Sequence, residues 1–374
     1  MLFLLGATFA SVMQMVGYIL IALLCLMSMV VIHEFGHYLA GKLLGFKIIE
    51  FGVGFGPRIF KHTSKKTGEI FSIRPFPLGG FCQFEGEDTS EEAGKEQSEG
   101  AFNKQAPWKR IIVLFSGALF NFLSAIILIA LVFTFYGQLL PTVSFVAVES
   151  DLARNSILQE GDVILEVDGN IVNILMQDDI SRALNVLGDE GTLKILRDGK
   201  VMNVDINRST IYERNDDGDL LLDEEGNKIS KYAYGFSVGL SYAKLNFFRA
   251  FGRAIVYCFY LVYKILWLFG QLFTGALSFS ESAGGPITVI STMSEATRQG
   301  LGTLLNVVCI ISANLAVMNL LPLPALDGSR IVFTTIEWII GRPVNRKVEA
   351  TIHTVGFLLL FGFAIFADVL HFIN

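Results

Sequence analysis

Three ionisable side chains lie inside an apolar segment that is long enough to cross a membrane. The segment begins near Gly17, and its last part reads His33-Glu34-Phe35-Gly36-His37. A transmembrane helix needs about 20 mostly apolar residues. Each charged group inside such a helix costs a few kcal/mol, so intramembrane charges mark functional sites. We therefore expect a functional site on this first helix.

The spacing of these residues is that of a metal site. Four residues advance a helix by slightly more than one turn, so His33 and His37 lie on one face and can bind one metal ion. Glu34 lies about 100° around the helix, where it can act as general base on an attacking water. The alternative is a chance match of five letters, which the apolar surroundings disfavour. The pattern predicts a catalytic zinc site.

The composition indicates a polytopic α-helical membrane protein. Of 374 residues, 52% are hydrophobic and only 17% are charged, which excludes a soluble multidomain chain. The net charge of -6 argues against a nucleic-acid partner. The four cysteines are scattered, so neither a disulfide framework nor a thiolate zinc site is expected. The first fifteen residues lack a basic region, so we expect no cleaved signal peptide.

Hydropathy predicts four transmembrane helices, at about 15–44, 111–136, 304–326 and 353–367. Phe247–Leu277 is also apolar, but Arg253, Lys264 and many aromatic residues favour a helix that lies in the membrane interface. We expect five segments. They are a membrane region at 1–140, a soluble α+β domain at 141–209, a β extension with an acidic hairpin at 210–246, an interfacial amphipathic segment at 247–300, and the last two spans at 301–374.

Two segments after the first span read as β-strands. Phe51–Pro57 alternates large apolar residues with glycine, and Glu69–Gly80 carries Pro75 and Pro77 on one edge, as an outer strand does. They form either a soluble hairpin or a sheet that dips towards the metal site. The acidic residues 85–100 predict a flexible loop.

The soluble domain shows alternating strands and one short helix. Strands are expected at 143–148 and 234–240, a turn, strand and turn over 157–169, a helix at 181–187, and a hairpin of 193–197 with 201–206 about Asp198-Gly199. Asn215–Asp219 lacks the ligand spacing of a calcium loop, so we interpret it as an acidic turn.

A catalytic zinc needs a third protein ligand and one open position. Asp327 follows Pro322 and Pro324, which break the end of the third span. Asp368 lies at the far end of the last span and reads as an interface residue. His353 could compete for the metal, but it begins a span and reads as an anchor. Asp327 is therefore the favoured third ligand.

These motifs resemble the site-2 protease family of intramembrane zinc metalloproteases. The resemblance rests on His33-Glu34-Phe35-Gly36-His37 in a first span and on Asn319-x-x-Pro322-x-Pro324-x-Leu326-Asp327-Gly328 in a later one. More narrowly, the chain resembles the bacterial RseP/RasP branch, with one PDZ-like domain inserted after the second span. Ala118 stands where the family usually has proline.

The resemblance implies a reaction and its residues. One zinc ion per chain would be bound by His33, His37 and Asp327, with Glu34 as catalytic base. Substrate would be held by Asn319, Pro322 and Pro324 and by a membrane-dipping sheet, where we expect Leu78, Gly79 and Gly80 to contact it. The substrate would be a transmembrane segment of another protein in the lipid bilayer, as in regulated intramembrane proteolysis of anti-sigma factors or signal-peptide remnants. The PDZ-like domain would contact substrate ectodomains or exclude large ones.

The distribution of basic residues predicts the topology. Lys42, Lys47, Lys109 and Arg110 flank one end of the first two spans, which places that end in the cytosol. Both termini and the PDZ-like domain would then lie outside the cytoplasm, in a multi-pass protein of the bacterial plasma membrane. A zinc transporter would carry ionisable residues along several spans, and an inactive PDZ scaffold would have lost a ligand or Glu34. Neither pattern is present.

Overall fold

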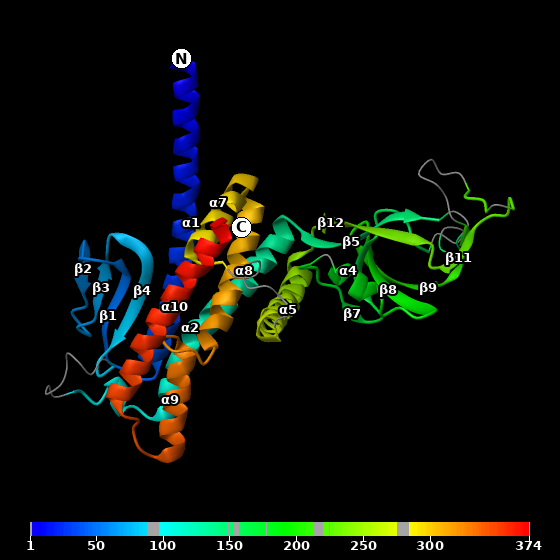
Figure 1. Ribbon diagram of the computed structural model, residues 1–374. Coiled ribbons are helices and arrows are strands. Elements are labelled where there is room, and N and C mark those ends of the chain that lie inside the picture. The colour runs from blue at the N-terminus through cyan, green and yellow to red at the C-terminus, as the bar shows by residue number, and fades with distance from the viewer. Residues whose placement is uncertain are drawn as a thin grey trace. The chain divides into compact units, whose positions relative to one another are not determined.

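The computed structural model describes residues 2–87, 97–147, 150, 152, 157–176, 178–212, 220–223, 225–274 and 284–373, and only the backbone of residues 2–10. It contains two compact units, Met1–Ala130 with Phe251–Asn374, and Leu131–Ala250. The first unit carries the helices and a small sheet, and the second is mostly β-sheet (Figure 1). The segment Asn215–Asp219 lies outside the described residues.

Seven long helices lie in the described part of the chain: α1 (Leu2–Leu43), α2 (Pro107–Phe135), α5 (Phe247–Thr274), α7 (Pro286–Gln299), α8 (Leu301–Leu320), α9 (Asp327–Ile340) and α10 (Arg346–Ile373). Among the residues described, five helices are long and apolar enough to cross a membrane, namely α1, α2, α5, α8 and α10. Hydropathy alone therefore gives one candidate span more than the four expected, and the additional candidate is α5.

The third expected span is shorter than predicted. We expected a helix from 304 to 326, but α8 ends at Leu320, and residues 321–326 form an irregular loop before α9 begins at Asp327. Pro322 and Pro324 explain the break, because proline lacks the N–H that a continuing helix needs. The predicted metal ligand Asp327 thus opens a new helix rather than closing an old one.

Helices α1 and α8 run in the same direction. Leu304, near the start of α8, lies in one buried cluster with Ala22 and Met29 of α1, whereas Asn319, near its end, lies against His33. Helix α2 runs the opposite way, since Val113 near its start contacts His37. The motif of α1, the start of α2 and the end of α8 therefore meet at one end of the bundle.

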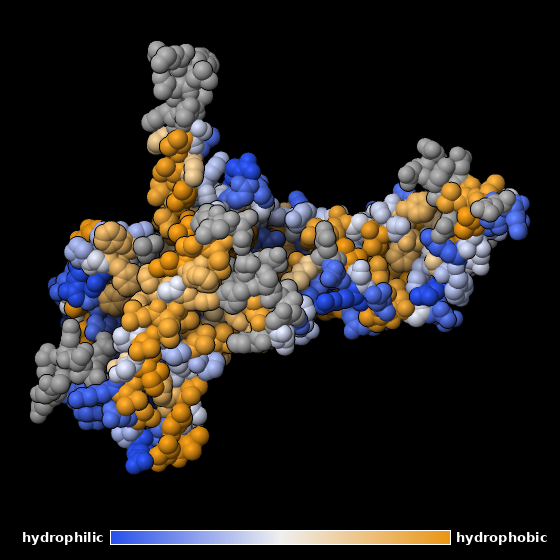
Figure 2. Space-filling view, in the orientation of Figure 1, coloured by the Kyte–Doolittle hydropathy of each residue, from blue (hydrophilic) through white to orange (hydrophobic). Residues whose placement is uncertain are grey.

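The outer surfaces of these helices are apolar. Exposed large side chains on α1 and α10 include Leu20, Leu24, Phe357 and Leu359, and Figure 2 shows the hydrophobic colour along both helices. Such a continuous apolar exterior is typical of a protein surrounded by lipid.

The small sheet has four strands, in the order β2-β3-β1-β4: β1 (Ile48–Phe55), β2 (Phe60–Thr63), β3 (Ile70–Ile73) and β4 (Phe76–Phe84). The single strand expected over 69–80 is wrong, because the chain turns at Arg74-Pro75 and β3 and β4 pair with opposite edges of β1. The pairing of β4 with β1 shifts register opposite Gly54, where Pro77, Leu78 and Gly79 form a bulge. β4 is an edge strand, where Pro77 is tolerated.

The second unit is built on a sheet in the order β12-β5-β6-β8-β9, with β7 (Asn170–Ile171) paired to β6. Its main strands are β5 (Gln138–Val146), β6 (Val163–Val167), β8 (Glu190–Arg197), β9 (Lys200–Asn207) and β12 (Phe236–Ala243). The helix α4 (Asp178–Leu184) packs on its core, and β10 (Ser209–Tyr212) pairs with β11 (Ser230–Ala233). The hairpin predicted about Asp198-Gly199 is present. Because β12 pairs with β5, one sheet joins strands from both predicted segments, 141–209 and 210–246.

Candidate active site

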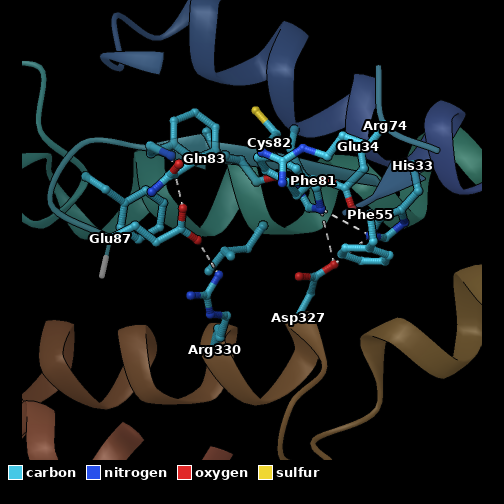
Figure 3. A pocket seen from close by; sticks show the side chains of 15 residues that line it. His33, Glu34, Phe55, Arg74, Phe81, Cys82, Gln83, Glu87, Asp327 and Arg330 are labelled. Atoms are coloured by element: carbon cyan, nitrogen blue, oxygen red, sulfur yellow. Dashed lines mark hydrogen bonds and ion pairs between the residues drawn. The ribbon is translucent and has the colours of Figure 1, made fainter. Parts of the chain in front are cut away.

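The three predicted metal ligands lie together. His33 Nε2 is 3.1 Å from His37 Nε2 and 3.0 Å from Asp327 Oδ2, and His37 Nε2 is 3.4 Å from the same oxygen. Both histidines are buried in α1, and Asp327 extends towards them from the first turn of α9 (Figure 3). Residues almost 300 positions apart in the sequence thus direct three donor atoms at one point.

The donor set fits a zinc ion. Tetrahedral zinc with bonds of about 2.0–2.1 Å separates its ligand atoms by about 3.3–3.4 Å, close to the three distances here. His37 Nδ1 lies 2.8 Å from the Val113 carbonyl and donates to it, which leaves the lone pair of Nε2 free for a metal. Two imidazole lone pairs and a carboxylate oxygen repel one another at this separation. A bound cation removes that repulsion.

A glycine of α2 leaves the space for these groups. A Cβ atom on Gly117 would lie 2.4 Å from His37 Nε2 and 2.7 Å from His33 Cε1. A Cβ on Gly36 of α1 would likewise lie 2.4 Å from the Ser116 carbonyl oxygen. Gly117 therefore borders the histidine pair directly.

Glu34 lies between the histidines and the edge strand of the small sheet. The backbone N–H of Cys82 in β4 donates to its carboxylate, and a Cβ on Gly80 would lie 3.4 Å from its Cγ. The carboxylate is thus held from the sheet side while it faces the same cavity as the ligands. A general base must lie beside the metal ligands and face the cavity, and Glu34 does both.

A cavity of about 700 Å³ opens in front of these groups. Helix α1 contributes His33, Glu34 and His37, α9 contributes Asp327 and Arg330, and β4 contributes four consecutive residues, Phe81 to Phe84. The cavity therefore joins the three donor atoms, the candidate base and a sheet edge in one space.

The comparisons with known proteins agree with this constellation. The sequence model of Peptidase family M50 matches residues 21–363. The chain belongs to this family. As an M50 peptidase, a site-2 protease, it is an intramembrane zinc metalloprotease.

Relatives cover nearly the whole chain. A protein of Fusobacterium nucleatum is 31% identical over 94% of this chain and 97% of its own length. A protein of Clostridium perfringens is 30% identical over 94% and 97%, and one of Rhizobium meliloti is 29% identical over 92% and 93%. Each is named as a putative zinc metalloprotease.

Asn319 of this M50 peptidase contacts His33, one of the predicted metal ligands. Its side-chain nitrogen lies 3.4 Å from His33 Nδ1. When Nε2 of His33 binds a metal, Nδ1 carries the proton, and a turn of the Asn319 amide by 180° places its oxygen where it accepts that N–H. We expected Asn319 to bind substrate, and the structure places its amide against His33 instead.

The remaining predicted substrate residues occupy two places. Pro322 and Pro324 lie in the loop before Asp327 and carry no side-chain hydrogen bond of their own. Gly79 and Gly80 lie in β4, where a Cβ on Gly79 would meet the Phe55 ring at 2.2 Å; of Leu78 only the backbone is described. The bulge and the glycines bring this part of β4 close to α1.

Sequence reasoning missed two ionic contacts beside the cavity. Arg330, one turn after Asp327, pairs with Glu87, which follows β4 and accepts from the backbone N–H of its last residue, Phe84. The pair joins α9 to the sheet (Figure 3). Glu87 belongs to the segment expected to be a flexible acidic loop, whose residues 88–96 lie outside the described part. No spacing rule links residues this far apart.

The second contact lies within the small sheet and centres on Glu50. Glu50 in β1 is 2% exposed and accepts hydrogen bonds from Arg58, Ser72 and Arg74. Burial alone would raise the pKa of Glu50, but these hydrogen bonds outweigh it and lower the pKa to about 2. Glu50 therefore stays ionised and anchors Arg74, whose guanidinium lies 4.7 Å from the centre of the Phe81 ring at the cavity wall.

Asp368 and His353 are not part of the histidine–aspartate cluster. Asp368 was expected at the membrane interface, but it is buried and accepts from the backbone N–H groups of Ile287 and Thr288 at the start of α7. Asp368 of α10 therefore caps the N-terminus of α7. His353 accepts a hydrogen bond from the backbone of Ala325, so it does not compete for the metal.

Proposed function

We propose that this M50 peptidase cleaves transmembrane segments of other membrane proteins, with one zinc ion bound by His33, His37 and Asp327. The observation that carries the proposal is the shared cavity, which is lined by the three metal-binding residues, by Glu34 and by residues of the edge strand β4. Zinc bound there would supply a Lewis acid for the scissile carbonyl and lower the pKa of the attacking water.

The residues around the cavity transfer protons, orient the histidines and hold the substrate. Glu34 accepts the proton of the attacking water on its carboxylate and returns a proton to the leaving amine nitrogen. Asn319 and the Val113 carbonyl hold the two imidazole rings in the orientation that presents Nε2. The substrate backbone pairs with β4 near Leu78, Gly79 and Gly80, while the loop with Pro322 and Pro324 borders it from the other side.

A sheet edge suits a helical substrate. The carbonyls of a transmembrane helix are engaged in its own hydrogen bonds, so the segment must unwind before attack. An extended peptide that adds to a sheet edge regains those hydrogen bonds. We infer that β4 captures the unwound segment, and that the PDZ-like unit contacts or excludes the substrate's ectodomain.

The first test concerns unwinding. A purified model substrate with a proline or glycine pair placed in its transmembrane segment should be cleaved about tenfold faster than its leucine counterpart, and mass spectrometry should place the cut within the segment. Leu78→Pro in the enzyme should slow cleavage without loss of zinc, because proline removes a donor from the edge. Cleavage outside the segment, or equal rates for both substrates, would contradict the proposal.

A matched variant separates strand pairing from general damage to the sheet. Lys61→Pro lies in β2, the edge strand on the opposite side of the same sheet, at a position whose N–H faces away from β3, and should leave the rate near that of the wild type. If Leu78→Pro also cleaves at the wild-type rate, pairing at Leu78 is wrong, and the segment from Asn319 to Pro324 becomes the substrate-holding candidate.

We also propose that only four helices cross the membrane and that α5 lies in its interface. α2 and α8 run in opposite directions, so α2 ends, and α8 begins, at the end of the bundle away from the ligands. The chain between them must return to the same side. α7 has 14 residues, or about 21 Å of helix, which is less than the hydrocarbon core of about 30 Å. If α5 crossed completely, no second span among the described residues between α5 and α8 would bring the chain back.

Cysteine labelling tests this topology. Lys244→Cys precedes α5 and Gln299→Cys precedes α8, and both positions are exposed. A membrane-impermeant maleimide should label both in right-side-out vesicles and neither in sealed inside-out vesicles, with the unsubstituted chain as the background for Cys25, Cys82, Cys258 and Cys309. Labelling from opposite sides would make α5 a fifth span.

A further inference from the structure

The loop that precedes Asp327 is held in an unfavourable conformation. It runs from Leu321 to Leu326, between α8 and α9, and Ala325 has a φ of +73°. A residue with a Cβ pays about 1 kcal/mol or more in this left-handed region, so surrounding contacts must maintain it. Asp327 follows two residues later, and the direction of its carboxylate depends on this turn.

Helix α10 supplies those contacts. His353 Nδ1 accepts the backbone N–H of Ala325 at 3.0 Å. Gly356, about one turn further along α10, faces Pro324 so closely that an added Cβ would lie 2.1 Å from the proline Cβ. The His353 ring also packs edge-on against Phe333 of α9, with 5.7 Å between ring centres. The turn is thus held between α10 and α9.

The hydrogen bond defines the form of the histidine. Because Nδ1 accepts, the proton of the neutral ring is on Nε2, which is buried and has no hydrogen-bond partner among the described residues. A buried donor without a partner is unfavourable, and leucine would fill a similar space without one. What distinguishes histidine at this position is the acceptor that it offers to Ala325.

We propose that His353 is a positioning residue for the third metal ligand: by accepting the N–H of Ala325 it fixes the turn that directs Asp327 towards His33 and His37. It touches neither substrate nor metal. The role goes beyond the proposed function, because it concerns the affinity of the site for zinc whichever segment the enzyme cleaves.

The experiment compares His353→Asn with His353→Leu in the full-length chain. The asparagine oxygen can replace Nδ1 as acceptor, whereas leucine cannot. Zinc affinity, measured by competition with a chelating dye, should fall about 10–100-fold in His353→Leu and stay within a few-fold of wild type in His353→Asn. Hydrogen–deuterium exchange of the Ala325 amide should quicken only in His353→Leu.

Further variants keep the proposal falsifiable if His353→Leu does not fold. Gly356→Ala displaces Pro324 with His353 intact and should also weaken zinc binding, whereas Gly362→Ala, on the same helix with open space around it, should not. Equal loss of zinc in the asparagine and leucine variants would assign the effect to ring packing and overturn the proposal. So would wild-type zinc affinity in both His353→Leu and Gly356→Ala.

Discussion

Replacing Glu34 by glutamine is expected to lower substrate turnover about 10³-fold or more, with zinc content and thermal stability unchanged. General bases contribute about 10²–10⁴-fold to enzymatic rates. The glutamine side chain keeps the shape of Glu34 and can still accept the N–H of Cys82, but it cannot take a proton from water. Turnover of a transmembrane substrate and bound zinc would be measured on the same purified sample.

A second carboxylate provides the control. Glu295 on α7 is exposed and pairs with Arg298, outside the cavity, so Glu295→Gln should cleave at the wild-type rate. Retained turnover in Glu34→Gln would show that another group removes the proton, and Glu87, the other glutamate at the cavity, would be examined next. Loss of zinc together with activity would instead assign Glu34 a structural part in the metal site.

The ligands could be predicted from the sequence because their chemistry leaves local signals. Two histidines four residues apart in an apolar helix define a helix face, and a carboxylate after two prolines marks a broken helix end. Both signals depend on neighbours in the chain. The structure then brings His33, His37 and Asp327 within 4.8 Å of one another.

The supporting contacts could not be predicted, since they join distant segments or use backbone atoms. The Val113 carbonyl has no side-chain signature. Arg330 and Glu87 are separated by more than 240 positions, and nothing in the local pattern of either predicts the other. The four-stranded sheet required a parallel pairing of β1 with β3, which alternation of apolar residues does not specify. The helix α9 was not predicted, because Asp327 was assigned to the end of the third span and not to the start of a new helix.

Gly117 shows why a small residue in a transmembrane helix is ambiguous. Glycine allows close helix packing in many membrane proteins, and a pair such as Gly117 and Asn121 gives the same sequence signal whether its neighbour is a backbone or a catalytic group. Only the position of the histidine nitrogens decides between the two. A Cβ there would lie 2.4 Å from His37 Nε2, closer than real Cβ contacts.

Gly117→Ala is therefore expected to reduce zinc affinity more than 100-fold and to abolish cleavage, while the chain still folds. The methyl group would displace the imidazoles from the positions that Val113 and Asp327 impose on them, and a metal site tolerates only small changes in ligand geometry. Zinc affinity by chelator competition, zinc content after gel filtration and thermal unfolding in detergent would separate a lost metal from a lost fold.

The control for this variant is Gly252→Ala in α5, where nothing lies within 4 Å of an added Cβ. It should bind zinc and cleave like the wild type, because alanine favours a helix over glycine. Gly36→Ala tests the helix contact itself, since its Cβ meets the Ser116 backbone and not a histidine. If Gly117→Ala binds zinc normally while Gly36→Ala does not, the spacing of α1 and α2 controls the site. Gly117 would then act only through helix packing.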